Sequence, residues 1–304
     1  MSHPCHRPRL IDWVMLLCLV ALWGSAFLLI AVALDGYAPL TISTGRLLIG
    51  SAVLFLIVLL SRRPLPRDPA LWRRFALMAV LGNALPFFLV SWGQQGVPSG
   101  LAGILMAVMP LVVVALAHFL VPGEQVTRRR ALGFAAGFAG IVVLLGPEIG
   151  AAQKTGPGTE ASGLIYPLAV LGAAVCYGLN VIVARRAPRS DPVVVSACVL
   201  FLAFLMSALV WAFPSGSAPL EPGNPARLAL FALGALCTGL ATVLYYQIVN
   251  AAGATFLSLI NYLIPVWAVL VGALVLGERL AASAFAGLAM ILSGIVLSQS
   301  RRRS

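Results

Sequence analysis

Residues 108–130 read VMPLVVVALAHFLVPGEQVTRRR, and residues 263–280 read LIPVWAVLVGALVLGERL. Each stretch is strongly apolar, contains a helix-breaking proline (Pro110 or Pro265), and ends its apolar run in a Gly-Glu pair. The prolines are 155 residues apart, and the pairs Gly123-Glu124 and Gly277-Glu278 are 154 residues apart. The repetition indicates one helical unit that was duplicated and used twice.

The composition indicates that these helices lie in lipid rather than in water. Of the 304 residues, 61% are apolar and only 10% are charged, and the mean hydropathy is +1.01. A soluble domain of this length needs more charge on its surface, so the chain is predicted to be an all-α membrane protein. Ten apolar windows of about 20 residues, the length that spans a bilayer, predict ten transmembrane helices. The windows are 11–32, 39–60, 73–92, 99–121, 130–147, 163–184, 192–213, 227–248, 254–276 and 281–299.

The distribution of basic residues predicts the orientation. With a cytoplasmic N-terminus, 16 of the 20 Lys and Arg residues fall in cytoplasmic segments, and only Lys154, Arg227 and Arg279 fall in outside loops. This bias predicts that both termini are cytoplasmic. The basic clusters are interpreted as topology signals and contacts with the lipid bilayer, and we expect no nucleic-acid partner.

The two halves match beyond the opening motif. Trp23-Gly24 aligns with Tyr177-Gly178, and GFAAGFAGIVVLL (133–145) aligns with GLAMILSGIVLS (287–298). We therefore predict a first five-helix repeat over 1–149, a polar, Gly-rich periplasmic linker over 150–162, and a second five-helix repeat over 163–304. Because five is odd, the second copy enters the membrane from the opposite face, as in many secondary transporters. The alternative is a duplication that serves stability alone.

These features resemble the EamA-type transporters of the drug/metabolite transporter superfamily. The resemblance rests on W-G-S-x-F (23–27), Arg-Leu-Leu (46–48), the helix count and the paired Pro…Gly-Glu motif. It implies a ten-helix, multi-pass carrier of the bacterial inner (plasma) membrane, often an exporter of amino acids or related metabolites. It also implies a central cavity lined by the first, third, fourth, sixth, eighth and ninth helices.

Polar and aromatic residues within the spans are candidates for the substrate cavity, because polar groups in lipid-spanning helices face the protein interior. Thr238, Thr242 and Tyr245 share one helix face, as do Ser258, Asn261 and Tyr262. Such a cavity suits a small amphipathic or zwitterionic molecule. The alternative role is interhelical hydrogen bonding and packing. The full set is Trp23, Asn83, Met106, Tyr177, Asn180, Thr238, Thr242, Tyr245, Ser258, Asn261 and Tyr262.

Pro110 and Pro265 are predicted hinges, because each proline leaves the carbonyl four residues earlier, at Met106 or Asn261, without its helical donor. The alternative is a static kink. Arg46, the only charged residue well inside a span, is a possible gate or anion contact. It could pair with a substrate carboxylate, snorkel outward, or bind carbonyls at the outer gate.

The titratable residues limit the mechanism. The nine acidic residues lie at span ends or in loops, so the sequence shows no carboxylate that relays protons across the membrane. His118 lies near the cytoplasmic end of its helix, where packing is the expected role. Glu124 and Glu278 are expected to order the turns into the following helices, with gating ion pairs as the alternative.

We therefore expect a secondary, alternating-access exporter or uniporter of a small metabolite, with facilitated transport or coupling by a route the sequence does not display. A membrane-embedded enzyme would need a cluster of catalytic groups, and a channel would normally show a filter or a ring of like groups. We expect no enzyme activity, cofactor or metal site, and a monomer.

Overall fold

The computed structural model describes residues 9–121, 127–152, 160–185, 191–212 and 223–299, and these residues form helices and connecting turns without any strand. The pair Gly123-Glu124 and residues 153–159 of the predicted linker lie outside the described residues. The helices are α1 (Leu10–Leu34), α2 (Pro39–Leu60), α3 (Pro69–Ala79), η1 (Val80–Ala84), α4 (Leu85–Gly93), α5 (Ser99–Met106), α6 (Met109–Leu120), α7 (Arg128–Ala152), α8 (Glu160–Arg185), α9 (Pro192–Trp211), α10 (Asn224–Gly234), η2 (Ala235–Leu240), α11 (Ala241–Leu257), α12 (Ile260–Leu276) and α13 (Ala282–Gln299).

Eight helical segments of the described chain are long and apolar enough to cross a membrane, and two shorter apolar helices cover 260–276 and 282–298. The predicted windows coincide with these segments to within a few residues at most ends. The largest difference is at the eighth and ninth windows, where α11 continues to Leu257 across a non-helical Gly253 (φ 85°). That glycine adopts a left-handed φ that L side chains rarely take, so the chain turns there from one apolar segment into the next.

Two of the spans contain a π-helical segment. Between α3 and α4 lies η1, and between α10 and α11 lies η2. Pro86 begins α4 and lacks the N–H that would pair with the Gly82 carbonyl, so the wider turn of η1 has a local cause. The segments begin 155 residues apart, the same offset as the two prolines of the opening motif. Such π turns frequently mark functional sites.

The two proline helices are not broken in the same way. Pro110 lies in the first turn of α6, and a turn at Ala107–Val108 separates α6 from α5. Pro265 lies inside the continuous helix α12, and the turn that precedes α12 is at Ser258–Leu259. A two-residue turn therefore interrupts the helix in both copies, but it comes directly before the helix start that holds Pro110 and well before Pro265.

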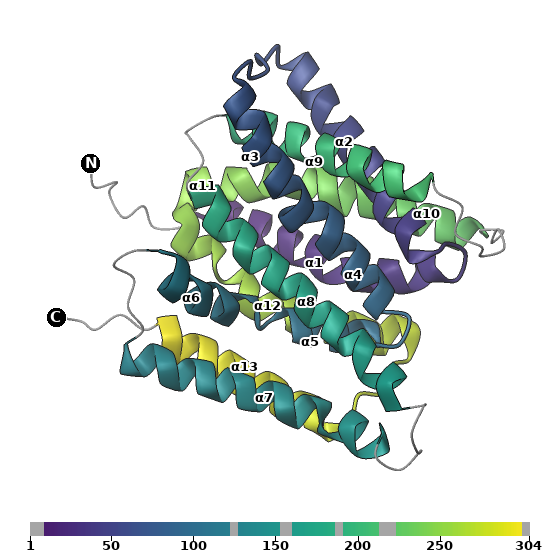
Figure 1. The fold of residues 1–304 in the computed structure, drawn as a ribbon, viewed down its shortest axis with the longest axis vertical. Coiled ribbons are helices and arrows are strands. Elements are labelled where there is room, and N and C mark those ends of the chain that lie inside the picture. The colour runs from purple at the N-terminus through teal and green to yellow at the C-terminus, as the bar shows by residue number, and fades with distance from the viewer. Residues whose placement is uncertain (1–8, 122–126, 153–159, 186–190, 213–222, 300–304) are drawn as a thin grey trace.

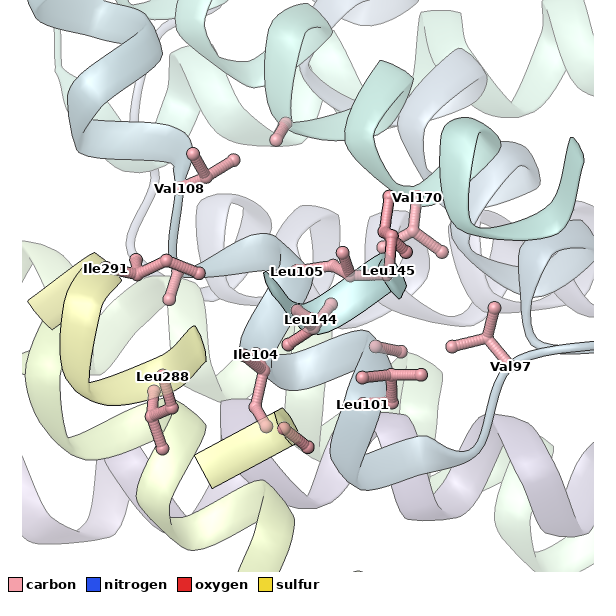
Figure 2. Packing of buried hydrophobic residues seen from close by; sticks show 14 of the residues in the cluster. Val97, Leu101, Ile104, Leu105, Val108, Leu144, Leu145, Val170, Leu288 and Ile291 are labelled. Atoms are coloured by element: carbon pink, nitrogen blue, oxygen red, sulfur yellow. The ribbon is translucent and has the colours of Figure 1, made fainter. Parts of the chain in front are cut away.

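The helices pack around several apolar clusters. The largest lies where α5 meets α7, α8 and α13. Figure 2 shows Leu105, Leu145 and Val170 close together and Ile291 at another part of the same cluster. Side chains on the outside of the bundle are large and apolar, such as Leu59 and Leu274, both about three-quarters exposed. An apolar surface around an apolar core is what a lipid solvent requires.

The pair α7–α13 forms one edge of the molecule (Figure 1) and packs through glycines. A Cβ added at Gly140 would lie 2.8 Å from the Gly287 carbonyl oxygen, and one added at Gly287 would lie 2.8 Å from the Gly140 carbonyl oxygen. Small residues permit this close approach of backbones, and in lipid such van der Waals packing is a main source of helix association.

We predict that Gly140→Ala destabilises the protein by about 1–3 kcal/mol, because the methyl group meets backbone and forces the two helices apart. The measurement is the apparent melting temperature of the purified protein in detergent. The matched control is Gly146→Ala on the same helix, where an added Cβ meets nothing within 4 Å. Equal melting temperatures for both variants would show that the α7–α13 contact does not limit stability.

Candidate functional site

Arg46 lies at the centre of the candidate site. Its side chain projects from α2 into the bundle and is only 8% exposed. Its Nε donates a hydrogen bond to the Thr238 hydroxyl at 2.7 Å, and its Cζ lies 3.9 Å from the centroid of the Phe87 ring. The outward-snorkelling alternative for Arg46 is therefore wrong.

Thr238 is buried in η2 and uses its hydroxyl twice. It accepts the hydrogen bond from Arg46 and donates one to the Leu233 carbonyl at 2.8 Å, five residues earlier. That donor bond orients the hydroxyl so that its lone pair faces Arg46. The wide π turn thus holds the guanidinium in one position.

Two aromatic residues stand beside this contact. The indole N–H of Trp23 donates to the Cys237 carbonyl at 3.1 Å, so α1 is bound to η2 next to Thr238. The ring of Tyr245 lies 5.7 Å from that of Trp23. Both side chains are half-buried, so the structure brings together two of the predicted aromatic wall residues.

A second group of predicted residues lies where α8 meets η1. Asn180 packs its amide against Gly82, and a Cβ on Gly82 would come within 2.5–3.0 Å of three Asn180 side-chain atoms. The buried Oδ1 of Asn180 has no hydrogen-bond partner among the described residues. Tyr177, one turn earlier on α8, lies within electrostatic range of Arg46, and Asn83 is half-buried in η1.

Other predicted cavity residues bind their own backbone. Thr242 donates to the Thr238 carbonyl at 2.6 Å, and Ser258 donates to the Thr255 carbonyl at 2.7 Å. These two hydroxyls are bonded locally to carbonyls of their own segment. Neither bond is the interhelical one that the alternative role describes. Asn261, Tyr262 and Met106 are half-buried, the first two on α12 and the third at the end of α5.

Glu278 joins the two halves of the chain. Its carboxylate accepts hydrogen bonds from the backbone N–H groups of Ser99 (2.7 Å) and Gly100 (2.9 Å), the first residues of α5. The expectation that Glu278 orders the turn into the next helix is therefore wrong. The carboxylate instead caps a helix N-terminus of the other half, where unpaired amides and the helix dipole favour an anion.

The proline-containing segments meet at this end of the bundle and separate at the other. Along α5, Gly103 approaches Ala268 of α12 so closely that an added Cβ would lie 2.5 Å from the Ala268 Cβ. Beyond the break, α6 turns away and packs mainly on α8, whereas the first half of α12 stays near α1. The two halves of the chain are therefore closed against each other at the Glu278 end.

The described residues lack the ligand cluster that a metal site would require. They contain no group of three or more His, Cys, Asp or Glu side chains able to hold a metal ion. His118 is exposed near the end of α6, with its ring 5.0 Å from that of Phe119. The site is thus one of binding groups, namely a guanidinium, hydroxyls, amides and aromatic rings.

Sequence reasoning missed several participants. Phe87, Gly82 and the α5 N-terminus received no role from it, because none is polar or periodic in a way that marks function. Pro86, three positions after the pair Gly82-Asn83 within an apolar span, was the available signal for η1.

Comparison with known proteins identifies the architecture. The EamA-like transporter family matches the chain twice, over residues 11–146 and 164–299. The chain belongs to the EamA-like transporter family. It is therefore a multi-span membrane protein of a transporter family. The family name points to a small-molecule substrate and to transport rather than to an enzyme reaction.

Curated relatives carry transporter names. The chain is 27% identical to "Uncharacterized transporter YoaV" of Bacillus subtilis, covering 93% of this chain and 95% of the relative. It is 28% identical to a "Probable terminal-alkyne amino-acid exporter" of Streptantibioticus cattleyicolor, covering 95% and 93%. It is 27% identical to an "S-adenosylmethionine/S-adenosylhomocysteine transporter" of Chlamydia trachomatis, covering 84% and 79%. A crystal structure with 24% identity matches its fold with a TM-score of 0.65, covering 96% of this chain and 97% of that one.

We predict that Glu278→Ala opens the end of the bundle where α5 meets α12. Each lost charge-assisted hydrogen bond contributes about 1.5–3 kcal/mol, so the closed arrangement becomes much less favoured. The measurement is thiol labelling in detergent of a Ser99→Cys variant that lacks the native cysteines. Ser99 is 1% exposed, so we expect its replacement to react slowly with Glu278 present and roughly tenfold faster or more without it.

A cysteine at the exposed position 95 is the control, and it should react equally fast with and without Glu278. Equal protection of the cysteine at position 99 in both backgrounds would show that the carboxylate does not hold this end closed.

Proposed function

We propose that this protein is an alternating-access carrier with ten membrane-spanning helices in two inverted five-helix repeats. The two matches to the family, separated by residues 147–163, support the duplication, and so does the 155-residue offset between η1 and η2. The positive-inside bias of the sequence supports cytoplasmic termini in a bacterial inner membrane. In this orientation the Glu278 end of the bundle faces outward.

The observation that carries this proposal is the one-sided closure between α5 and α12. In an inverted repeat, two equivalent helices can pack at either end, and alternating access exchanges one packed end for the other. Here Gly103 and Ala268 approach closely, and the Glu278 carboxylate holds Ser99 and Gly100 at the same end. We take this arrangement as the state that is closed to the outside.

The transported molecule in this proposal is a small amphipathic metabolite, an amino acid or a related compound, carried as an exporter or uniporter. The half-buried aromatic rings of Trp23 and Tyr245 supply apolar contact, and Asn180 supplies an unfilled acceptor. Two relatives are named for an amino acid and for an amino-acid derivative, which supports the same class.

The test is uptake of radiolabelled amino acids and S-adenosylmethionine into proteoliposomes, with and without an imposed pH gradient. We expect saturable uptake and counterflow for at least one solute, because a carrier binds its substrate in each cycle. Rates that ignore the gradient support a uniporter, and rates that follow it indicate proton coupling. Unsaturable ionic current, or no counterflow for any solute, would contradict the carrier.

We predict that Pro110→Ala lowers the transport rate about tenfold or more while substrate binding is retained. Alanine restores the N–H that the Met106 carbonyl lacks, so α5 and α6 can join into one helix and the break is lost. Two quantities are measured for each variant: the initial rate of transport into proteoliposomes, and substrate binding as a shift of the melting temperature. Pro225→Ala is the matched control, because Pro225 lies exposed in the first turn of α10, where proline breaks no helix. Wild-type rates for Pro110→Ala would remove the hinge role from this position.

A further inference from the structure

The guanidinium of Arg46 is a buried cation whose hydrogen-bonding capacity is mostly unused. Arginine carries five N–H donors and stays charged in proteins. Among the described residues, only Thr238 accepts a hydrogen bond from it, through Nε. The two Nη groups therefore keep their donors free, while the Phe87 ring covers one face of the guanidinium plane.

No described carboxylate neutralises this charge. The ion pairs found in the described part of the chain join Arg9 to Asp12 and Arg63 to Asp191, both at helix ends. Glu278 is bound to the N-terminus of α5. An unpaired charge inside a membrane bundle raises the free energy of the folded protein, and the cation–π contact with Phe87 offsets only part of that increase. A retained charge of this kind is a functional-site hypothesis by default.

The position is also preorganised for an anion. Because the Thr238 hydroxyl is oriented by its bond to the Leu233 carbonyl, the Nε contact fixes the plane of the guanidinium. A fixed guanidinium edge matches the two oxygens of a carboxylate, and such forked pairs are stronger than single neutral hydrogen bonds. The aromatic residues Trp23 and Tyr245 and the unfilled Asn180 acceptor lie on neighbouring helices.

We propose that the Nη groups of Arg46 bind the carboxylate of the transported solute, so that the carrier selects carboxylic acids over their neutral derivatives. This inference rests on the proposed carrier function and adds the substrate group that the site recognises. The solute's carboxylate supplies the countercharge that the protein lacks, so the occupied site holds a neutral ion pair while access to it exchanges between the two membrane faces.

The experiment measures thermal stabilisation of the purified protein by the proteinogenic L-amino acids and by their carboxamides, followed by counterflow with the acids that stabilise. For at least one acid we expect stabilisation and transport, with its carboxamide bound roughly tenfold more weakly or worse. We expect Arg46→Gln to abolish this preference and Arg46→Lys to keep the charge but weaken binding, because lysine lacks the fork. Arg227→Gln, which removes an exposed arginine from α10, is the control and should bind like the wild type.

The stability of the empty protein separates binding from a purely structural role. Glutamine can still donate to Thr238 and removes a buried charge, so Arg46→Gln without ligand should melt at or above the wild-type temperature. A lower melting temperature with acid binding intact would overturn the inference, as would equal binding of acids and carboxamides. Saturable transport of solutes that lack a carboxylate would overturn it while leaving the carrier standing, whereas absence of any counterflow would overturn the carrier itself.

Discussion

Lipid supplies no hydrogen-bond partner, so polar groups within the spans must pair inside the protein. Helix α1 shows how this constraint organises the bundle. Three of its residues, each two positions apart, make polar contacts with η2, with α12 and with the turn that follows α4. The pairs are Trp23 with the Cys237 carbonyl, Ser25 with the Trp267 indole, and the Phe27 carbonyl with Gln94. These contacts fix α1 between the two halves of the chain, next to the site that contains Arg46.

The same constraint limits where the two π-helical segments can lie. A π turn leaves backbone groups displaced from the regular helix, and in lipid this is tolerated only where the protein interior receives them. In η2 the Thr238 hydroxyl pairs with a carbonyl of its own helix and also accepts from Arg46. In η1 the Gly82 backbone is covered by Asn180. The irregular turns thus lie where helices from different parts of the chain converge.

Close helix contact depends on small residues, because lipid removes most of the hydrophobic drive for helices to associate. Glycines between α7 and α13 and between α5 and α12 allow this contact, but the second interface differs in one respect. Gly277 takes a left-handed conformation (φ 66°), and the carboxylate that follows it caps α5. The contact between α5 and α12 therefore depends on one ionic cap in addition to packing, and an ionic cap can be released without unpacking a core. That combination suits a contact that opens in the transport cycle proposed above.

The sequence by itself determined the apolar spans, because the length of an apolar run is a local property and can be compared directly with the thickness of the bilayer. It also indicated the family, which the family comparison confirms, and it predicted the repeat from motifs that recur at a fixed spacing. Only the tertiary structure decided where Arg46 points and which amides Glu278 binds, because both depend on residues nearly 180 or more positions away. It likewise decided that Pro110 begins a new helix whereas Pro265 lies within one. The two prolines have the same chemistry but different surroundings, because α6 packs mainly on α8 whereas α12 packs on α1 and α5. Local sequence carries no information about those neighbours.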